Sequence, residues 1–266
     1  MILRGYYNSD VLHTCINIQF IIPDTGAGPY KVVYLLHGLH GNQGTWIDYT
    51  ALPYFSKEYD AIFVIPEAGR SFYCNPKYGR KYYSFVSEEL PQISRKIFNI
   101  SDKREDTAVM GCSMGGYGSL KLALTNPEQF GFCGSIAAAC VYLKPILDGL
   151  REDADSYRKK GAEEEEILND LYTIYGDDLE YVPENDVSAL VKNFPAGKPL
   201  PKIYATCGTE DSLLEENRKL VDEMKNTAFD FTYEEWSGGH DWYFFNDALK
   251  KTLDFWYNRN AKQEQG

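Results

Sequence analysis

The stretch Gly111-Cys112-Ser113-Met114-Gly115-Gly116 decides the fold of this 266-residue chain. It follows an apolar run, 107–110, that is typical of a strand, and it precedes a run, 118–124, that is typical of a helix. Between a strand and a helix, the G-x-S-x-G pattern makes a sharp turn that holds its serine in a strained conformation above the sheet. A side chain at position 111 or 115 would collide with the neighbouring strand or helix. The pattern predicts a nucleophilic Ser113; the alternative is a glycine-rich turn in which Ser113 is only the helix N-cap.

The positions of the histidines in the chain indicate which one is the general base for this serine. An α/β-hydrolase orders its catalytic residues as serine, acid and histidine along the chain. Of the four histidines, only His240 follows Ser113. It lies in a glycine-flanked loop between a strand-like run, 229–233, and an apolar helix-like run, 242–256. Because a loop at a strand end suits a residue that transfers protons, we expect His240 to be the general base.

The acid is expected just past the carboxyl end of another strand. The run 202–207 has the composition of a buried strand, and it ends in Gly208-Thr209-Glu210-Asp211-Ser212, a turn that leads into a further helix. Asp211 is the predicted partner of His240. Glu210 is the local alternative, and a role for Asp211 as a helix N-cap is the purely structural one.

A third loop predicts an oxyanion hole. The strand-like run 32–36 is followed by His37-Gly38-Leu39-His40-Gly41-Asn42, an H-G-x-x-G pattern. We expect the backbone N–H of Leu39 and that of Met114, at the start of the elbow helix, to bind the oxyanion. Gly38 would let the backbone approach the substrate closely. The histidines of this loop, His37 and His40, are expected only to shape it, because His240 already supplies the base.

Composition sets the class of protein. Hydrophobic residues make up 44% and charged residues 25%, as in an ordinary globular protein. The net charge of −12 argues against nucleic acid or an anionic membrane as a partner. The acidic run 163–166 is expected to be a solvated helix face. No run approaches the ~20 apolar residues of a membrane span, and the N-terminus lacks the pattern of a signal peptide, so a cytoplasmic location is expected.

The six cysteines do not have the spacing of a disulfide scaffold or a metal site. Cys15, Cys133 and Cys207 lie in strand-like runs and are expected to be small core residues. No metal and no cofactor is predicted.

Strand-like and helix-like runs alternate along most of the chain. The strand-like runs 14–22 and 61–65 and the helical spacing over 82–98 continue the pattern set around the elbow. The charged segment 140–200 breaks it and includes one expected helix, 163–175. We therefore predict an α/β-hydrolase fold: one domain, 1–266, with a mostly parallel sheet, helices on both faces and a small helical insertion near 140–200 that acts as a cap.

With these motifs in order, the chain resembles the esterase D-like family of α/β-hydrolases, and within it bacterial tributyrin-esterase-type, feruloyl and acetyl carboxylesterases. The resemblance covers nearly the whole chain and is weakest over 140–200. It rests on five stretches: Leu35 to Asn42, Arg70 to Tyr73, Ser113 to Lys121, Cys207 to Asp211, and Gly239 to Trp242.

The resemblance implies a serine carboxylesterase that hydrolyses short-chain acyl esters through an acyl-enzyme, its substrate a small-molecule or oligosaccharide acyl ester. A feruloyl or acetyl-xylan esterase acting on plant polysaccharide is the alternative. S-formylglutathione hydrolases of the family usually carry a serine-glycine-leucine-threonine-cysteine loop where this chain has His37 to Gly41, which disfavours that activity.

Two further expectations concern substrate and assembly. Trp242 and Tyr243, just past His240, are candidate walls of the substrate pocket or core residues of the last helix. A homo-oligomer is compatible with the sequence, which indicates no interface.

A non-catalytic binding module on the same fold is the alternative from another functional class. The complete set of Ser113, Asp211 and His240 argues against it.

Overall fold

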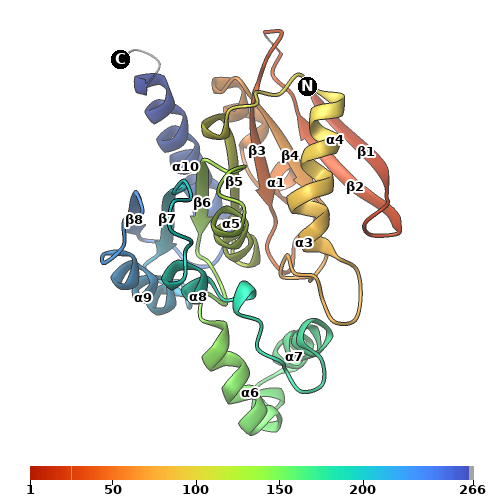
Figure 1. The fold of residues 1–266 in the computed structure, drawn as a ribbon, viewed down its shortest axis with the longest axis vertical. Coiled ribbons are helices and arrows are strands. Elements are labelled where there is room, and N and C mark those ends of the chain that lie inside the picture. The colour runs from red at the N-terminus through yellow and green to blue at the C-terminus, as the bar shows by residue number, and fades with distance from the viewer. Residues whose placement is uncertain (25, 264–266) are drawn as a thin grey trace.

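One sheet forms the centre of the molecule (Figure 1). The structure, a computed structural model, describes residues 1–24 and 26–263, of which 258–263 by backbone alone; residues 25 and 264–266 of the domain expected over 1–266 lie outside it. In this described part the sheet has eight strands, in the order β1-β2-β4-β3-β5-β6-β7-β8. They are β1 (Ile2–Ser9), β2 (Thr14–Ile21), β3 (Lys31–Leu36), β4 (Ala61–Pro66), β5 (Thr107–Cys112), β6 (Phe132–Ile136), β7 (Lys202–Gly208) and β8 (Phe231–Trp236).

The six strands from β3 to β8 are parallel, whereas the hairpin β1–β2 joins the sheet antiparallel through β2 and β4. Parallel strands end at the same edge of a sheet, so the loops after β3, β4, β5, β7 and β8 all lie along one edge. This mostly parallel sheet with helices on both faces is the α/β-hydrolase fold that the sequence predicted.

Helices cover both faces of the sheet, as Figure 1 shows. One core packs between the sheet and α4, α5 and α8, and the other between the sheet and α1, α2 and α10. The helices are α1 (Thr45–Asp48), α2 (Leu52–Phe55), α3 (Tyr82–Ser84), α4 (Leu90–Ile97), α5 (Met114–Thr125), α6 (Leu143–Arg158), α7 (Ala162–Tyr175), α8 (Val187–Lys192), α9 (Leu214–Met224) and α10 (Trp242–Gln263).

Strand β3 is apolar over Val32–Leu36 because both of its faces are buried. Val32, Tyr34 and Leu36 enter the first core, and Val33 and Leu35 enter the second. Side chains alternate between the faces of a strand, so a strand covered on both sides needs an unbroken apolar run rather than an alternating one. All five side chains are fully buried.

The hairpin at the sheet edge departs from expectation. Strand β1 was not anticipated, because its exposed side chains, such as Tyr6, carry no alternating apolar pattern. Cys15 on β2 was expected in the core and is exposed: it pairs with Asn8 of β1 and faces away from its buried neighbour Ile16. Cys133 and Cys207 are buried as expected.

The segment between β6 and β7 is helical. Helices α6 and α7 project beyond the body of the molecule at its lower end (Figure 1), and α8 returns to the sheet. The expected helix over 163–175 corresponds to α7, while α6 was not anticipated. Backbone N–H groups of Lys77 and Tyr78 donate to the carbonyls of Ile174 and Thr173, so α7 is fastened to the loop that follows β4. Within the described residues, no helix is both long enough and apolar enough to cross a lipid bilayer.

Candidate active site

The turn between β5 and α5 holds Ser113 in the strained backbone conformation expected of a nucleophile elbow. Its φ of 55° and ψ of −120° are values that side chains other than glycine rarely adopt. Hydrogen bonds to the neighbouring backbone stabilise this conformation. The Ser113 N–H donates to the Ile136 carbonyl at 2.9 Å, and the Ser113 carbonyl accepts from the Tyr117 N–H at 3.0 Å. The helix therefore starts immediately after the serine and leaves the hydroxyl at the sheet edge.

Three side chains from three loops meet at this edge. His240 Nε2 lies 2.9 Å from the Ser113 hydroxyl oxygen, and His240 Nδ1 lies 2.7 Å from Asp211 Oδ2. A carboxylate only accepts, so Nδ1 carries the proton and Nε2 is free to accept from the serine. The Asp211 side chain is fully buried, whereas that of His240 is about one-third exposed at 33%. The Asp211 carboxylate is thus shielded from solvent, while the His240 imidazole is partly open to it.

The backbone next to Ser113 supplies hydrogen-bond donors. The place where a Gly38 Cβ would stand is 3.4 Å from Ser113 Cβ, so the loop after β3 runs beside the serine. Across the described residues, neither the N–H of Leu39 nor that of Met114 has a protein acceptor. Met114 is also the first residue of α5, where the helix dipole favours negative charge.

Comparison with known proteins places the chain in a family. The "Esterase" family model, described as "Putative esterase", matches residues 9–255. An acetyl esterase of Caldicellulosiruptor saccharolyticus is 32% identical over 234 residues, covering 87% of this chain and 85% of that protein. The chain belongs to this esterase family.

Solved structures agree with the assignment. The fluorophosphonate-binding serine hydrolase F of Staphylococcus aureus superposes with a TM-score of 0.82 at 25% identity over 97% of this chain and 98% of that one. The S-formylglutathione hydrolase of the same organism gives 0.80 at 26% over 97% and 98%. A ferulic acid esterase at 24% identity, with a TM-score of 0.70 over 97% of both chains, shares the fold. This esterase is a carboxylic ester hydrolase.

Glu210, the alternative acid, has a different position in this esterase. It accepts hydrogen bonds from Thr209 Oγ1 at 2.8 Å, from Ser237 Oγ at 3.4 Å and from the Gly238 N–H. The hydrogen bonds from Thr209 and Gly238 lower the pKa of Glu210. Its carboxylate therefore ties the turn after β7 to the loop that carries His240, and Asp211 alone of the two contacts the imidazole.

Cys112, directly before the serine, is buried in the esterase. Burial raises the pKa of its thiol to about 12, so the thiol stays protonated at neutral pH. Since the thiolate is the nucleophilic form, Cys112 is not a candidate nucleophile at neutral pH.

The two aromatic residues after the base differ in their surroundings. The Trp242 ring packs edge-on against Trp46, with centroids 5.2 Å apart, and lies 5.5 Å from Tyr49. Tyr243 is 89% exposed and points away from the core. Trp242 thus combines core packing with partial exposure, while Tyr243 has no packed surroundings.

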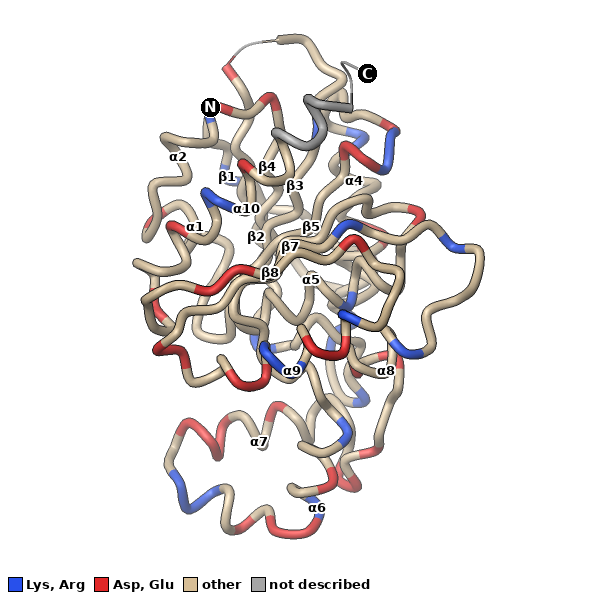
Figure 2. The backbone as a smooth tube through the Cα atoms, turned by 90° about the vertical axis from the view of Figure 1, so that its left-hand side faces the viewer, with Lys and Arg blue, Asp and Glu red and all other residues tan. Residues whose placement is uncertain are grey.

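The acidic run on α7 makes contacts that the sequence did not reveal. As expected, the run is solvated, with Glu163 61% and Glu166 68% exposed. In addition, His40 Nε2 lies 3.5 Å from Glu163, and Arg70 contacts Glu166 at 3.7 Å and, further along the helix, Asp170 at 2.8 Å. Figure 2 shows acidic residues at several places along α7. Positions 163, 166 and 170 recur at intervals of three and four, so they share one helix face; that spacing was the available signal.

Proposed function

We propose that this esterase hydrolyses short-chain acyl esters through an acyl-enzyme on Ser113, with His240 as general base and Asp211 as its orienting acid. The hydrogen-bonded line from Ser113 through His240 to Asp211 is the observation that carries the proposal. It joins a nucleophile to a base and the base to a buried carboxylate, which is what activates a serine at neutral pH.

The first half-reaction forms the acyl-enzyme. Ser113 Oγ attacks the ester carbonyl carbon while its proton passes to His240 Nε2. The resulting imidazolium is stabilised by Asp211, and the oxyanion accepts hydrogen bonds from the N–H groups of Leu39 and Met114. His240 then returns the proton to the leaving alkoxide oxygen, the C–O bond breaks, and the alcohol departs.

The second half-reaction repeats these steps with water. His240 takes a proton from water as its oxygen attacks the acyl carbon, and the same two N–H groups hold the oxyanion. The proton then passes to Ser113 Oγ as the acyl bond breaks, which releases the carboxylic acid and restores the enzyme. No cofactor enters either step.

Substrate class is proposed from the relatives and the mouth of the site. The curated relative that is 32% identical to this chain is an acetyl esterase, which favours a small acyl group. Helix α7 is proposed to act as part of a cap, because it contacts the loop after β3, which runs beside Ser113, and also the loop after β4. Trp242 is the proposed pocket wall, with Tyr243 available only to an outer part of the substrate.

The S-formylglutathione hydrolase structure at 26% identity makes thioester hydrolysis the second candidate. The histidine-containing loop after β3 disfavours it. The two activities differ in the leaving group, which is a glutathione thiolate in one and an alcohol in the other.

A substrate panel with active-site variants tests the proposal. We expect acetate and butyrate esters to be hydrolysed faster than feruloyl esters and S-formylglutathione. Ser113→Ala should lose at least about 10⁴-fold in kcat and all labelling by a fluorophosphonate, with an unchanged melting temperature. Full activity of Ser113→Ala would refute the mechanism, and a preference for the feruloyl ester would refute the substrate class.

Two matched variants test whether Asp211 or Glu210 is the acid that orients His240. Asp211→Asn should reduce kcat by about 10⁴-fold, because the amide leaves the imidazole in the wrong tautomer. Glu210→Gln should cost less than about 10-fold, since Glu210 only holds the loop that carries His240. The reverse order of the two losses would reassign the acid to Glu210.

A further inference from the structure

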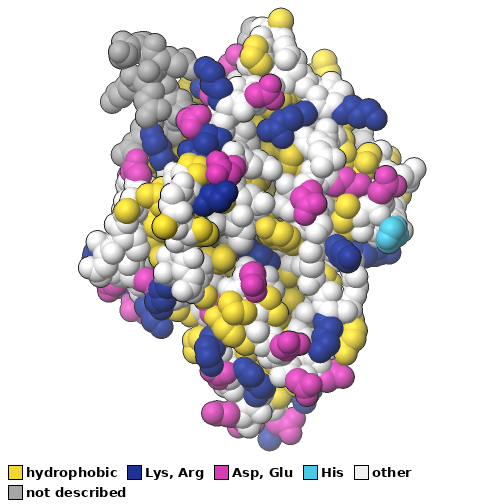
Figure 3. Space-filling model, in the orientation of Figure 1, with side chains coloured by type: hydrophobic (Ala, Val, Ile, Leu, Met, Phe, Trp, Pro, Cys, Tyr) yellow, Lys and Arg dark blue, Asp and Glu magenta, His cyan; other side chains and the backbone are white. Residues whose placement is uncertain are grey.

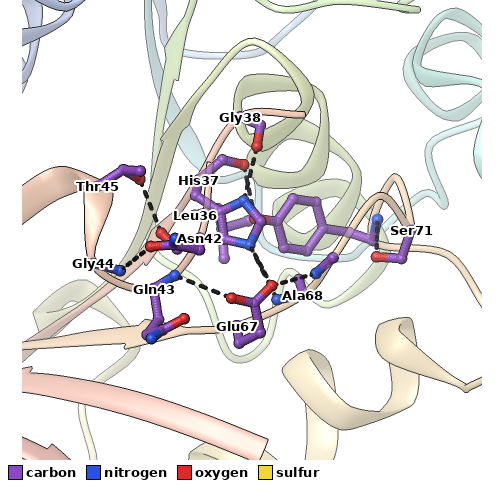
Figure 4. Close-up of polar contacts among 12 residues, drawn as sticks. Leu36, His37, Gly38, Asn42, Gln43, Gly44, Thr45, Glu67, Ala68 and Ser71 are labelled. Carbon is purple, nitrogen blue, oxygen red and sulfur yellow. Dashed lines mark hydrogen bonds and ion pairs between the residues drawn. The ribbon is translucent and has the colours of Figure 1, made fainter. Parts of the chain in front are cut away.

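His37 is a buried histidine that the proposed mechanism does not use. It is the first residue after β3, and its side chain is fully buried. Its ring lies between the backbone of the Leu39 loop and the loop that follows β4 (Figure 4). A buried imidazole must have both nitrogens satisfied, so the identity of its partners shows what it holds in place.

Two backbone groups fix the protonation of the ring. His37 Nδ1 lies 2.8 Å from the Gly38 carbonyl oxygen, and the Ala68 N–H donates to His37 Nε2 at 3.0 Å. A carbonyl oxygen only accepts and an amide N–H only donates. His37 is therefore neutral, with its proton on Nδ1, and donates that proton to Gly38.

The Gly38 carbonyl is held from two sides. It accepts from His37 Nδ1 and also from the Gly41 N–H at 3.0 Å. The Gly38–Leu39 peptide is trans, so its C=O and its N–H point in opposite directions. Fixing the carbonyl toward His37 thus turns the Leu39 N–H away from His37. This is the peptide that runs beside Ser113, with the Gly38 Cβ position 3.4 Å from Ser113 Cβ.

The geometry points to His37 as a positioning residue for the oxyanion hole: its Nδ1–H orients the Gly38–Leu39 peptide so that the Leu39 N–H is presented to the developing oxyanion. This inference rests on the proposed function, in which Leu39 is a donor. According to this inference, His37 contributes to kcat. The sequence alone indicated only that His37 shapes its loop.

Glu67 holds the other side of the ring. Its carboxylate accepts from the Gly69 N–H at 2.7 Å and from the Gln43 N–H at 3.4 Å, and it lies 3.5 Å from His37 Nε2 (Figure 4). Burial acts to raise the pKa of Glu67, and the hydrogen bonds from the amides of Gly69 and Gln43 act to lower it. A carboxylate that stays ionised thus joins the loops after β3 and β4 around the imidazole.

Two substitutions separate the roles of the ring nitrogens. In asparagine the side-chain N–H₂ stands near the place of Nδ1, and in glutamine it stands near the place of Nε2. His37→Asn keeps a donor for Gly38, whereas His37→Gln loses it. The control is His40→Asn, in the same loop, because the His40 side chain is exposed and contacts Glu163 rather than Gly38.

We expect His37→Gln to lower kcat on an acetate ester by about 100-fold with KM changed less than about threefold, because the oxyanion forms only in the transition state. His37→Asn should stay within about fivefold of the wild type, and His40→Asn within about twofold. Rates are expressed per active site, titrated by the burst of released alcohol, so that a misfolded fraction does not count.

A transition-state analogue supplies the second readout. The inhibition constant of a trifluoromethyl ketone, which forms an oxyanion on Ser113, should rise with His37→Gln in proportion to the fall in kcat/KM. Equal kcat for the asparagine and glutamine variants, or an unchanged inhibition constant, overturns the role of His37. Both results leave the Ser113 mechanism intact, whereas activity in Ser113→Ala removes the mechanism itself.

Discussion

Gly115 shows at the scale of one residue why the elbow sequence is so restricted. A Cβ at this position would collide with the Leu36 carbonyl oxygen and lie 2.8 Å from that of His37, and both atoms belong to the backbone. Neither can move without displacing the end of β3 and the loop that carries Leu39. The glycine therefore lets α5 approach β3, the strand that leads into the proposed oxyanion loop.

Alanine at this glycine should be costly, and a second glycine provides the control. Gly115→Ala is expected to lower the free energy of unfolding by about 3 kcal/mol and to reduce kcat, because the collision displaces the donors beside Ser113. Gly149→Ala on α6 should raise stability by about 0.5–1 kcal/mol, since its Cβ would meet no atom within 4 Å and alanine favours a helix. Denaturant unfolding measures both. Equal effects of the two substitutions would contradict the collision.

The site residues differ in how far the sequence could predict them. Ser113 follows β5 directly, and Asp211 and His240 lie in the short loops that follow β7 and β8. Their order in the chain is that of an α/β-hydrolase, so the sequence could propose them as a set. The contact between His37 and Ala68 joins residues whose strands pair in the sheet but lie about 30 positions apart. No local pattern indicates such a contact. His37 and His40 were expected only to shape their loop, because His240 already supplied a candidate base.

At the scale of elements, one charged face of α7 contacts the loop that follows β4. Arg70 Nε and an Arg70 terminal nitrogen contact Asp170 at 2.9 Å and 2.8 Å, and both side chains are mostly shielded, at 29% and 19% exposed. Burial raises the pKa of Asp170, and the guanidinium of Arg70 opposes this rise. Ionising Asp170 in the folded protein therefore costs free energy, and the charge of Arg70 makes this cost smaller.

Removing the Arg70 guanidinium should increase the free-energy cost of ionising Asp170, so the stability of the variant should depend on pH. A carboxyl whose folded pKa lies above its unfolded value destabilises the fold when ionised, and the penalty fades as pH falls through the folded pKa. Arg70→Gln should therefore lower the free energy of unfolding by about 1–2 kcal/mol at pH 7, with a smaller deficit at pH 5. In the double variant Arg70→Gln, Asp170→Asn, the deficit should not change with pH. A deficit that grows on acidification would contradict this account.

The insertion also shows where element prediction fails. The acidic run and the apolar positions after it predicted α7 correctly, but α6 was missed. Its residue Asp153 has non-helical backbone angles that interrupt the helical period. Tertiary contacts fix such an irregular helix, and the contacts of α7 with the loops after β3 and β4 are equally invisible in the local sequence.

For the whole molecule, the predictable part is the parallel half of the sheet. Strands buried on both faces need continuous apolar runs, and these are distinctive between helical segments. The edge hairpin gives no such signal, because β1 is largely exposed and β2 has an uncovered face at Cys15. The sequence thus predicted the centre of the fold and the edge of the sheet that carries the site, but not the outermost strand.

The net charge of −12 makes a prediction for the whole molecule. Acidic residues recur along α7 (Figure 2), and both acidic and basic side chains lie on the projecting lower end (Figure 3). An anionic ester approaching the loops that α7 contacts meets a repulsive field, and salt shortens its range from about 30 Å at 0.01 M to about 10 Å at 0.1 M. Raising the salt should therefore favour anionic substrates selectively.

A pair of esters of nearly equal shape tests this. For 4-acetoxybenzoate, kcat/KM should rise about threefold between 0.01 M and 0.3 M salt, while for neutral 4-acetoxybenzamide it should stay within about 1.3-fold. Glu163→Gln combined with Glu166→Gln should reduce the salt effect on the anionic ester, because both carboxylates lie on the face of α7 that contacts His40 and Arg70. If salt lowered the rate for the anion, a local cation such as Arg70 would outweigh the net charge, and the field at the site would be set by the loop after β4 rather than by the whole surface.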